Sequence, residues 1–388
     1  YDGVNGFAAF QLGNPNLGWE ETAQQNYGID LSFFKRRLMI SVDRYVKTTT
    51  ELLYDRLIPE ETGFSSVRAN IGSVENKGIE VDIQTTPIQR EDFRWFTSFN
   101  IAYNQNKVLK LADEDGFEID GYFIEEGESI GNMYGYKNLG IYQFDESNAY
   151  SDDGVRLNPN FDENDNFVNY TLNGQEYSGN VNQQSFNNRV LRGGDIIWED
   201  QDGNFNIDAQ NDRTIIGNGL SDFVGGFRNS FDYKEFSFSA LLTFNFGNDI
   251  YRGYDHTRDK ANNSVYTPGP ERIDGAWINQ GDITRYPSLE TSRSQNRSGY
   301  ESNYVSKGDF IKIQNIRFGY NFNKQTLDKL KFINNLSFSV VINNLLTFTN
   351  YEGYNPELGW QGDPLRPGWD NLRYPNKTDI IFSLNAQF

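Results

Sequence analysis

Apolar and polar side chains alternate with a period of two in many separate stretches of the chain. In residues 236–246 one face is almost entirely apolar and the other is mostly polar: Phe236, Phe238, Ala240, Leu242, Phe244 and Phe246 against Ser237, Ser239, Leu241, Thr243 and Asn245. Such alternation is typical of a β-strand with one apolar and one polar surrounding. The pattern recurs and predicts about nine strands, at 28–34, 38–47, 78–88, 92–104, 223–233, 236–247, 309–322, 335–346 and 379–388.

The segments between these strands fall into two length classes. Very short connections lie at 34–37, 87–92 and 233–235, and long polar ones lie at 48–77, 105–222, 248–308 and 347–378. If consecutive strands run in opposite directions, every very short turn falls at one end of the sheet and every long loop at the other. This asymmetry is typical of an outer-membrane β-barrel, whereas a soluble sandwich has no reason to sort its loops.

The alternation alone does not fix the number of strands. Residues 130–144 also look strand-like, so they belong either to one long external excursion or to an additional pair of barrel strands. Helical periodicity is scarce, and only residues 326–330 could form a turn or two of helix. A barrel must pair every strand edge because lipid offers no hydrogen bonds, so we expect further strands to precede Tyr1.

Composition narrows the functional classes. The chain has 388 residues, 35 Lys and Arg against 54 Asp and Glu, no cysteine and one histidine. The acidic excess argues against nucleic-acid binding, and the missing thiols exclude disulfides and cysteine-based zinc sites. His256 lies in a polar stretch and is expected at the surface, so we expect no catalytic triad and no enzyme activity.

Aromatic residues are abundant in the long segments. Their rings could stack on sugars or clamp peptides, although an interfacial girdle or plain loop packing would use the same residues. The candidate substrate-contacting residues are Tyr254, Trp277, Tyr286, Trp360 and Trp369.

Residues 200–212 carry oxygen-bearing side chains at the spacing of a calcium loop. The candidate ligands of a structural Ca²⁺ ion are Asp200, Asp202, Asn204, Asn206, Asp208 and Asp212. The loop has Phe205 where calcium loops have glycine, and Asn211 where they have glutamate. A turn whose polar side chains cap their own backbone is the alternative.

Several ordered motifs resemble the C-terminal part of SusC/RagA-like TonB-dependent transporters. They span 14–20, 70–80, 129–136, 194–203, 308–316, 341–345 and 351–357, and a final alternating strand ends at Phe388. The resemblance implies that residues 1–388 are the C-terminal part of an all-β, antiparallel transmembrane barrel of about 22 strands with long extracellular loops. It also implies an N-terminal plug and early strands that this sequence does not contain.

For function, the resemblance implies a multi-pass protein of the cell outer membrane that imports oligomeric nutrients, either glycans or peptides. The implied partners are a SusD-like surface lipoprotein, the TonB–ExbB–ExbD complex acting through the plug, the cargo and the lipid bilayer. A passive porin-like channel and a secreted carbohydrate-binding β-domain remain the alternatives.

Overall fold

The computed structural model describes residues 12–112, 116–260, 268–290, 299–330, 332–358 and 365–388. Nine strands form one antiparallel sheet in the order β1-β2-β5-β6-β19-β20-β23-β24-β26, with β1 and β26 at its edges. Their bounds are β1 Glu21–Phe33, β2 Leu38–Thr50, β5 Gly72–Gln89, β6 Phe93–Leu111, β19 Phe223–Tyr233, β20 Phe236–Phe246, β23 Phe310–Asn321, β24 Asn335–Thr349 and β26 Asp379–Gln387. The predicted strands correspond one to one to these nine.

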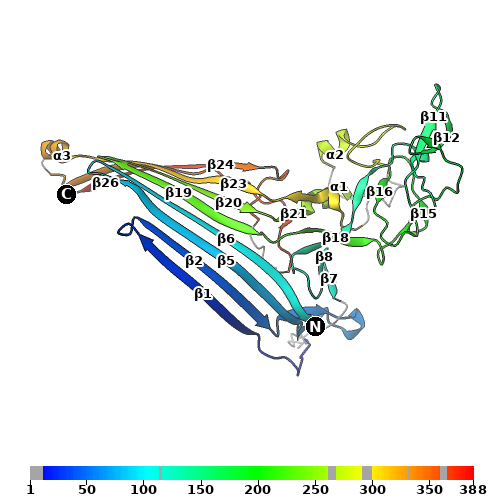
Figure 1. Ribbon diagram of the computed structural model, residues 1–388, viewed down its shortest axis with the longest axis horizontal. Helices are drawn as coiled ribbons and strands as arrows, with labels where there is room; N and C mark the ends of the chain where they lie inside the picture. The colour runs from blue at the N-terminus through cyan, green and yellow to red at the C-terminus, as the bar shows by residue number, and fades with distance from the viewer. Residues whose placement is uncertain (1–11, 113–115, 261–267, 291–298, 331, 359–364) are drawn as a thin grey trace, which may run out of the picture.

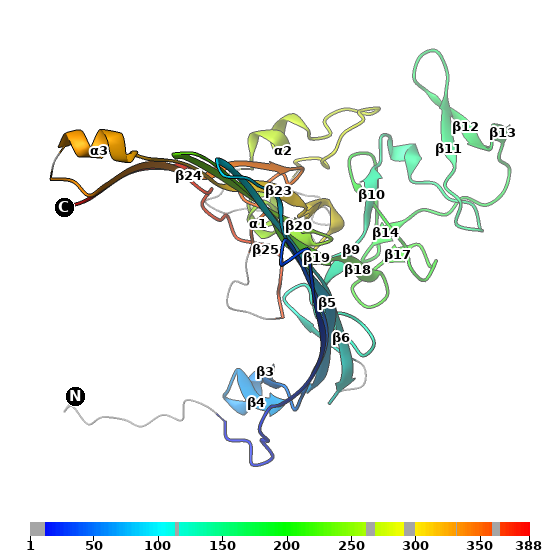
Figure 2. The same ribbon diagram turned by 60° about the vertical axis from the view of Figure 1, so that its left-hand side comes forward.

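All short connections lie at one end of the sheet, which we call the turn end, and all long segments lie at the other, the loop end (Figure 1). The predicted helical turn is α3, Lys324–Leu330, which lies in the turn-end connection between β23 and β24. The Asn323 side chain accepts a hydrogen bond from the Thr326 backbone N–H at 3.1 Å, as residues that begin helices do. Figure 2 shows that the sheet is curved, as a barrel wall must be.

The observed strands β1, β5 and β6 extend further toward the loop end than the sequence predicts. β1 begins at Glu21, whereas the alternation begins only at 28. The residues added in β1 are mostly polar on both faces. Those added in β5 and β6 include Val74, Val108 and Leu111, which pack in a buried cluster at the loop end. A strand that rises above a bilayer meets water on both sides, so its backbone pairing continues while the apolar alternation stops.

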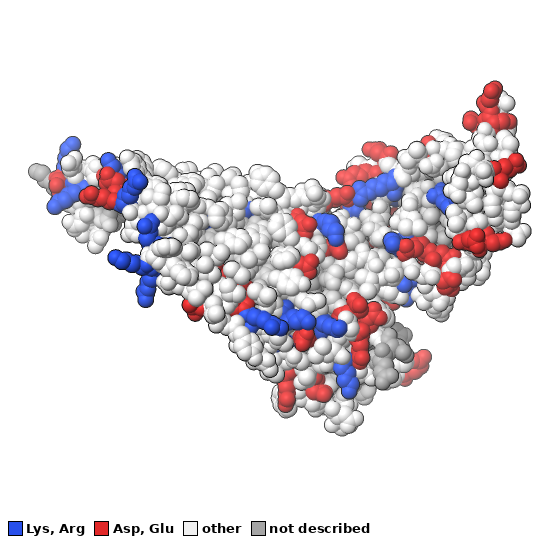
Figure 3. All heavy atoms as spheres, viewed as in Figure 1, with Lys and Arg blue, Asp and Glu red and all other residues white. Residues whose placement is uncertain are grey.

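Cross-strand partners place apolar residues on one face of the sheet across six strands. The register runs Trp95–Phe231–Phe238–Phe318–Val340–Phe382, and directly opposed residues share a face. We call this the outer face. Phe382 is 70% exposed, and neither Phe238 nor Phe338 is buried. Figure 3 shows a broad zone with few charged side chains over β19, β20, β23 and β24.

The opposite face, the inner face, is polar. One register row crosses eight strands as Asp30–Ser41–Asp82–Asn100–Gly226–Thr243–Lys312–Thr347. Apolar-out and polar-in alternation is the arrangement of a transmembrane barrel wall. Among the described residues, no helix is long and apolar enough to cross a membrane.

The long segments carry their own small sheets, which the sequence does not predict. The run 130–144 forms β9, Asn132–Tyr136, and β10, Asn138–Ile141. The remaining loop strands are β3 Leu53–Leu57, β4 Ser66–Asn70, β7 Phe117–Ile119, β8 Tyr122–Ile124, β11 Asn158–Phe161, β12 Phe167–Leu172, β13 Gln175–Glu176, β14 Ser185–Phe186, β15 Arg189–Val190, β16 Ile196–Trp198, β17 Asn206–Ile207, β18 Arg213–Asn218, β21 Asp249–Arg252, β22 Val305–Lys307 and β25 Trp369–Asp370. β9 pairs with β8 and β18, β10 pairs with β16, and neither joins the wall. Two loop helices are α1, Gly253–Lys260, and α2, Pro270–Asp274.

The largest fully buried side chains lie mainly in these loops and not in the wall. Trp198, Tyr122, Tyr142 and Tyr251 are all buried among loop residues. Apolar burial of this kind is what stabilises a folded core in water. The loops are therefore folded structures with cores of their own.

Candidate functional site in the loops

A polar recess lies where α1, the start of α2, residues 351–354 and β25 come together. Its volume is about 290 Å³. Its lining carries both charge signs and aromatic rings, namely Arg252, Arg258, Asp255, Glu271, Glu352, Asp370, Tyr254, Tyr351 and Tyr354. We call it the loop recess. Convergent charged groups beside aromatic rings are the kind of lining that orients a polar ligand.

Arg252 is the central cation of the loop recess. Its guanidinium is 4% exposed and lies 3.1 Å from the Asp255 carboxylate and 3.0 Å from that of Glu352. It also donates to the Asn303 backbone carbonyl at 2.9 Å, while its Nε has no hydrogen-bond partner among the described residues. A buried donor without a partner carries a free-energy cost that an added acceptor relieves. The ion pairs with Asp255 and Glu352 hold the Arg252 side chain in place in spite of this cost.

Glu352 joins two cations. Arg285 donates to both of its oxygens, at 2.9 and 2.8 Å. These hydrogen bonds, followed by the charge of Arg252, hold the pKa of Glu352 below its ordinary value although partial burial opposes the shift. The carboxylate therefore stays ionised at neutral pH and keeps both arginines in place.

Tyr351 forms the wall of the loop recess next to Glu352. Its hydroxyl donates to the Asp370 carboxylate at 2.5 Å. Burial, followed by this hydrogen bond, raises the pKa of Tyr351 far above its ordinary value. The phenol is therefore a permanent donor that fixes β25 against residues 351–354.

An aromatic cluster supports the recess from β21. The rings of Tyr251 and Trp369 stack with centroids 4.8 Å apart, and Tyr300 meets both edge-on at 5.7 and 5.6 Å. His256 lies against Tyr251 and Tyr304, and its Nε2 is 2.9 Å from the Gly299 carbonyl oxygen. The predicted surface position of His256 is wrong, because α1 turns this residue inward into the cluster, where it is buried.

The candidate substrate-contacting aromatics fall in different environments. Tyr254 is half-buried in the lining of the loop recess, and Trp369 is half-buried in the stack behind it. Trp277 and Tyr286 are 6% and 5% exposed and pack inside the loops, where the Trp277 indole N–H donates to the Gln143 carbonyl at 3.1 Å. In this conformation neither of these two offers a ring face to a ligand. Trp360 lies outside the described residues.

The acidic loop brings together three of its six candidate ligands. One carboxylate oxygen each of Asp200, Asp202 and Asp212 lies within 4.8 Å of the others. Asp212 is buried, and burial followed by the nearby charges of Asp200 and Asp202 raises its pKa, although hydrogen bonds from the Asp208 and Gln201 backbone oppose this. Three carboxylates at this separation suit a divalent cation.

The other three candidates of the acidic loop lie outside this cluster, and each accepts hydrogen bonds from neighbouring groups. Asp208 accepts hydrogen bonds from the backbone N–H groups of Gln210 and Asn211 at 2.8 and 2.9 Å, and these lower its pKa. Asn204 accepts from the Asn206 backbone, and Asn206 accepts from Ser185 at 2.9 Å. The capped-turn alternative therefore describes this part of the loop, and calcium binding stays a prediction.

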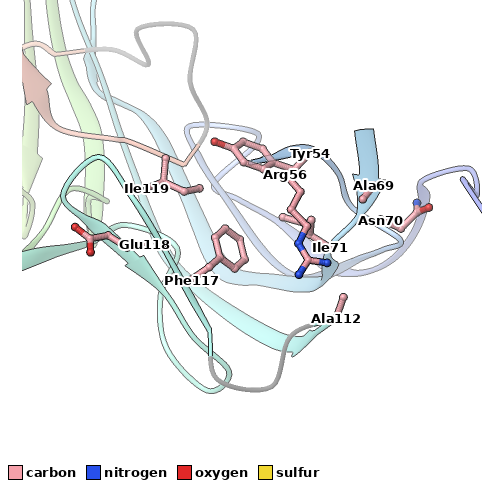
Figure 4. Close-up of a pocket in the computed structure, with 9 residues that line it drawn as sticks. All are labelled: Tyr54, Arg56, Ala69, Asn70, Ile71, Ala112, Phe117, Glu118 and Ile119. Atoms are coloured by element: carbon pink, nitrogen blue, oxygen red, sulfur yellow. The ribbon is translucent and has the colours of Figure 1, made fainter. Parts of the chain in front are cut away.

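Figure 4 shows a second recess at the loop end, with a volume of about 230 Å³. Tyr54, Ile71, Phe117 and Ile119 give it apolar walls, with Arg56 at its side. The rings of Tyr54 and Phe117 are 6.4 Å apart and pack on a cluster that includes Leu365. This recess suits an apolar group, in contrast to the charged loop recess.

Sequence reasoning identified Tyr254 but not Arg252, Glu352 or Asp370 as members of one site. Glu352 lies in the motif 351–357, which indicates the family resemblance but does not identify a binding site. Arg252, 100 residues earlier, carries no local signal that would connect it to Glu352. Only the folded loops bring the two side chains together.

Comparison with known proteins gives a consistent assignment. Residues 1–132 match the family described as TonB dependent receptor-like, beta-barrel. The chain is 70% identical over its full length to TonB-dependent receptor P39 of Formosa agariphila, of which it covers 37%. It is 28% identical over 388 residues to TonB-dependent receptor SusC of Bacteroides thetaiotaomicron, covering 97% of this chain and 32% of that protein.

The fold agrees with solved structures. The RagAB peptide importer in the "closed-closed" state matches 100% of this chain with a TM-score of 0.73 at 20% identity, over 38% of the solved chain. The chain thus spans little more than a third of the length of the curated relatives that it matches. With the nine-stranded wall and its one-sided loops, these matches show that the chain is similar to part of the β-barrel of SusC-like TonB-dependent receptors.

Proposed function

We propose that the whole protein is an outer-membrane importer of oligomeric nutrients, energised through TonB. The observation that carries this proposal is the polarity of the nine-stranded wall, with Phe238 and Phe382 on the outer face and Asp82 and Lys312 on the inner face. A wall of this kind separates lipid from a polar passage. Residues 1–388 supply the C-terminal part of that wall, while a plug lies elsewhere in the protein.

The proposed partners follow from the relatives. SusC and the RagAB importer are similar to this chain, and we infer a SusD-like surface lipoprotein above the loop end and the TonB–ExbB–ExbD complex on the opposite side of the membrane. The folded loops offer such a lipoprotein a defined surface, because they have buried cores of their own. The protein needs no catalytic residues, since movement of the plug and not bond cleavage would drive import.

We place the first cargo contact at the loop recess. Its paired arginines and carboxylates can bind either sugar hydroxyls or peptide groups, and the Tyr254 ring can stack on the cargo. Glycans and peptides therefore both remain candidate cargo.

The test uses the full-length receptor in cells that possess or lack a functional TonB complex. Radiolabelled oligosaccharide and oligopeptide mixtures are supplied separately, and accumulation inside the cells is measured. We expect accumulation of one mixture to require TonB. Uptake that persists without TonB would instead identify a passive channel, and no uptake of either mixture would contradict the proposal.

A further inference from the structure

The inner face carries two separate blocks of charge. Asp30, Asp43, Glu80 and Asp82 lie on β1, β2 and β5, and register places Asp43 directly opposite Glu80. Arg228, Arg317 and Arg94 lie on β19, β23 and β6. We call these the acidic block and the basic block. The inner wall is therefore electrically polarised from one side of the sheet to the other.

The three arginines occupy successive levels of the inner face. Arg228 is paired with Leu241, Arg317 with Ser239, and Arg94 with Asp232, which is in turn paired with Ser237. Each level is two residues closer to the turn end than the last, a step of about 7 Å along a strand. The basic block therefore descends along the wall from its middle toward the turn end.

None of the three guanidinium groups has an ion pair or hydrogen bond with another residue that the structure describes; Arg94 lies 6.0 Å from the centre of the Phe96 ring. Arg228, Arg317 and Arg94 are exposed. By contrast, Arg252 and Arg285 in the loops each bind a carboxylate. Within the described residues, the guanidinium groups of the basic block are therefore left on the inner face without a bound partner.

The lower part of the basic block forms a recess of about 440 Å³. Arg94, Arg317, Ser230, Ser237, Ser239 and Asp232 line it. Two guanidinium groups against one carboxylate leave the recess with a positive charge, and three hydroxyls add neutral donors. Planar guanidinium groups bind carboxylate and sulfate oxygens through paired N–H donors.

We propose that this recess binds an oxyanion group of the cargo, a carboxylate or a sulfate ester, as the cargo moves toward the turn end. The proposal rests on the import function proposed above and narrows its cargo to an anionic oligomer. The acidic block supports this choice of ligand, because its carboxylates repel an anionic cargo and direct it toward β6–β23. The stepped arginines then offer it successive binding positions.

The test exploits the absence of cysteine from this chain. Ser239→Cys places a thiol in the recess of the full-length receptor, and Ser41→Cys places a matched thiol beside Asp30 in the acidic block. Each thiol is treated with an anionic sulfonatoethyl and with a cationic trimethylammonioethyl methanethiosulfonate reagent. The rate of each reagent with each thiol is divided by the rate of the same reagent with free cysteine, so that the ratio reports only the local electrostatic potential and the access of the reagent.

We expect the anionic reagent to be favoured at least tenfold at Ser239→Cys and disfavoured at Ser41→Cys. Adding Arg317→Gln or Arg94→Gln to Ser239→Cys should lower the preference by about threefold each, and Arg44→Gln, on the outward side of β2, should leave it unchanged. Inorganic sulfate at low ionic strength should slow the reaction at Ser239→Cys only. The same arginine variants should reduce uptake of an anionic oligosaccharide, oligogalacturonate, relative to neutral maltotriose.

An unreactive thiol at Ser239→Cys in folded receptor would overturn the proposal, because another part of the protein would then fill the recess. Equal preference at the two thiols, or a preference that the arginine variants do not change, would overturn it as well. TonB-dependent uptake that continues in any of these cases leaves the import function standing. Loss of TonB dependence in the unmodified receptor refutes that function separately.

Discussion

The bond between Lys312 and Glu357 joins the barrel wall to the segment 350–378, and its removal gives the sharpest test of how the loops are held. Lys312 is on the inner face of β23, with its side chain 2% exposed, and its Nζ lies 2.6 Å from the Glu357 carboxylate. The same carboxylate accepts a short hydrogen bond from Asn376, and the Glu357 backbone carbonyl accepts one from Arg373 at 3.2 Å. Glu357→Gln therefore leaves a buried ammonium group without its counter-charge.

Removing one partner of a fully buried ion pair costs about 3–5 kcal/mol. Because the Glu357 side chain is 30% exposed, water compensates part of this, and we expect a loss of about 2–3 kcal/mol. The loss applies to local opening of the segment 350–358, whose amides should exchange hydrogen roughly 30- to 150-fold faster. Hydrogen exchange followed by mass spectrometry on the purified full-length receptor measures this directly.

Two further variants complete the experiment. Lys312→Met combined with Glu357→Gln removes the stranded charge, so its exchange should be slower than that of Glu357→Gln alone. Lys307→Gln breaks the ion pair with Asp249, in which the lysine side chain is 69% exposed. It should change the free energy of local opening by less than about 1 kcal/mol. If Glu357→Gln has no larger effect than Lys307→Gln, the reasoning about the buried ammonium is refuted.

Three other predictions follow from the wall, the acidic loop and the loop recess. Phe382→Arg puts a charge on the outer face and should lower the stability of the folded barrel by about 2–4 kcal/mol near the membrane midplane, while Ser383→Arg on the inner face should be tolerated. Heat-modifiable gel mobility measures the folded fraction of each variant in outer membranes, and equal fractions contradict the assignment of the two faces. Calorimetry should show that Asp212→Asn weakens Ca²⁺ binding at least tenfold, whereas Asp153→Asn does not. Because the pKa of Asp212 is raised, the metal-free loop is destabilised as pH rises through that pKa, and protons compete with Ca²⁺ for the site. The apparent calcium affinity should therefore fall at low pH, and an affinity that does not depend on pH argues against the site. Glu352→Gln should reduce cargo uptake about tenfold without lowering receptor abundance, and unchanged uptake contradicts the assignment of the loop recess. Because the pKa of Glu352 is lowered, the contribution of its carboxylate to the stability of the recess is present at neutral pH and is lost as pH falls through that pKa.

The wall was predictable because alternation is a local signal. Most inward residues of a strand differ in polarity from their outward neighbours, so residues 236–246 reveal a strand without reference to any other segment. Loop length adds the direction of each strand. The predicted strands begin too late at β1 and β5, because their first residues lie at the loop end, outside the apolar layer, where the alternation is absent.

The loops were not predictable in the same way. Their strands are short, and several, such as β16, are buried along their whole length, so neither period nor length identifies them. His256 illustrates the difficulty: its neighbours in sequence are polar, yet α1 turns its ring into an aromatic cluster. A residue's immediate sequence does not report which distant segment will cover it.

The sequence by itself determined that the chain forms an antiparallel wall with an apolar and a polar face, that its long segments lie at one end, and which family it resembles. Only the tertiary structure decided that residues 130–144 stay outside the wall, that Arg252 meets Glu352, and that the inner charges separate into two blocks. The physical reason is the range of the interactions. Strand alternation follows from burial of each side chain against lipid or water, whereas ion pairs and charge blocks depend on strand register and loop packing between residues far apart in the chain.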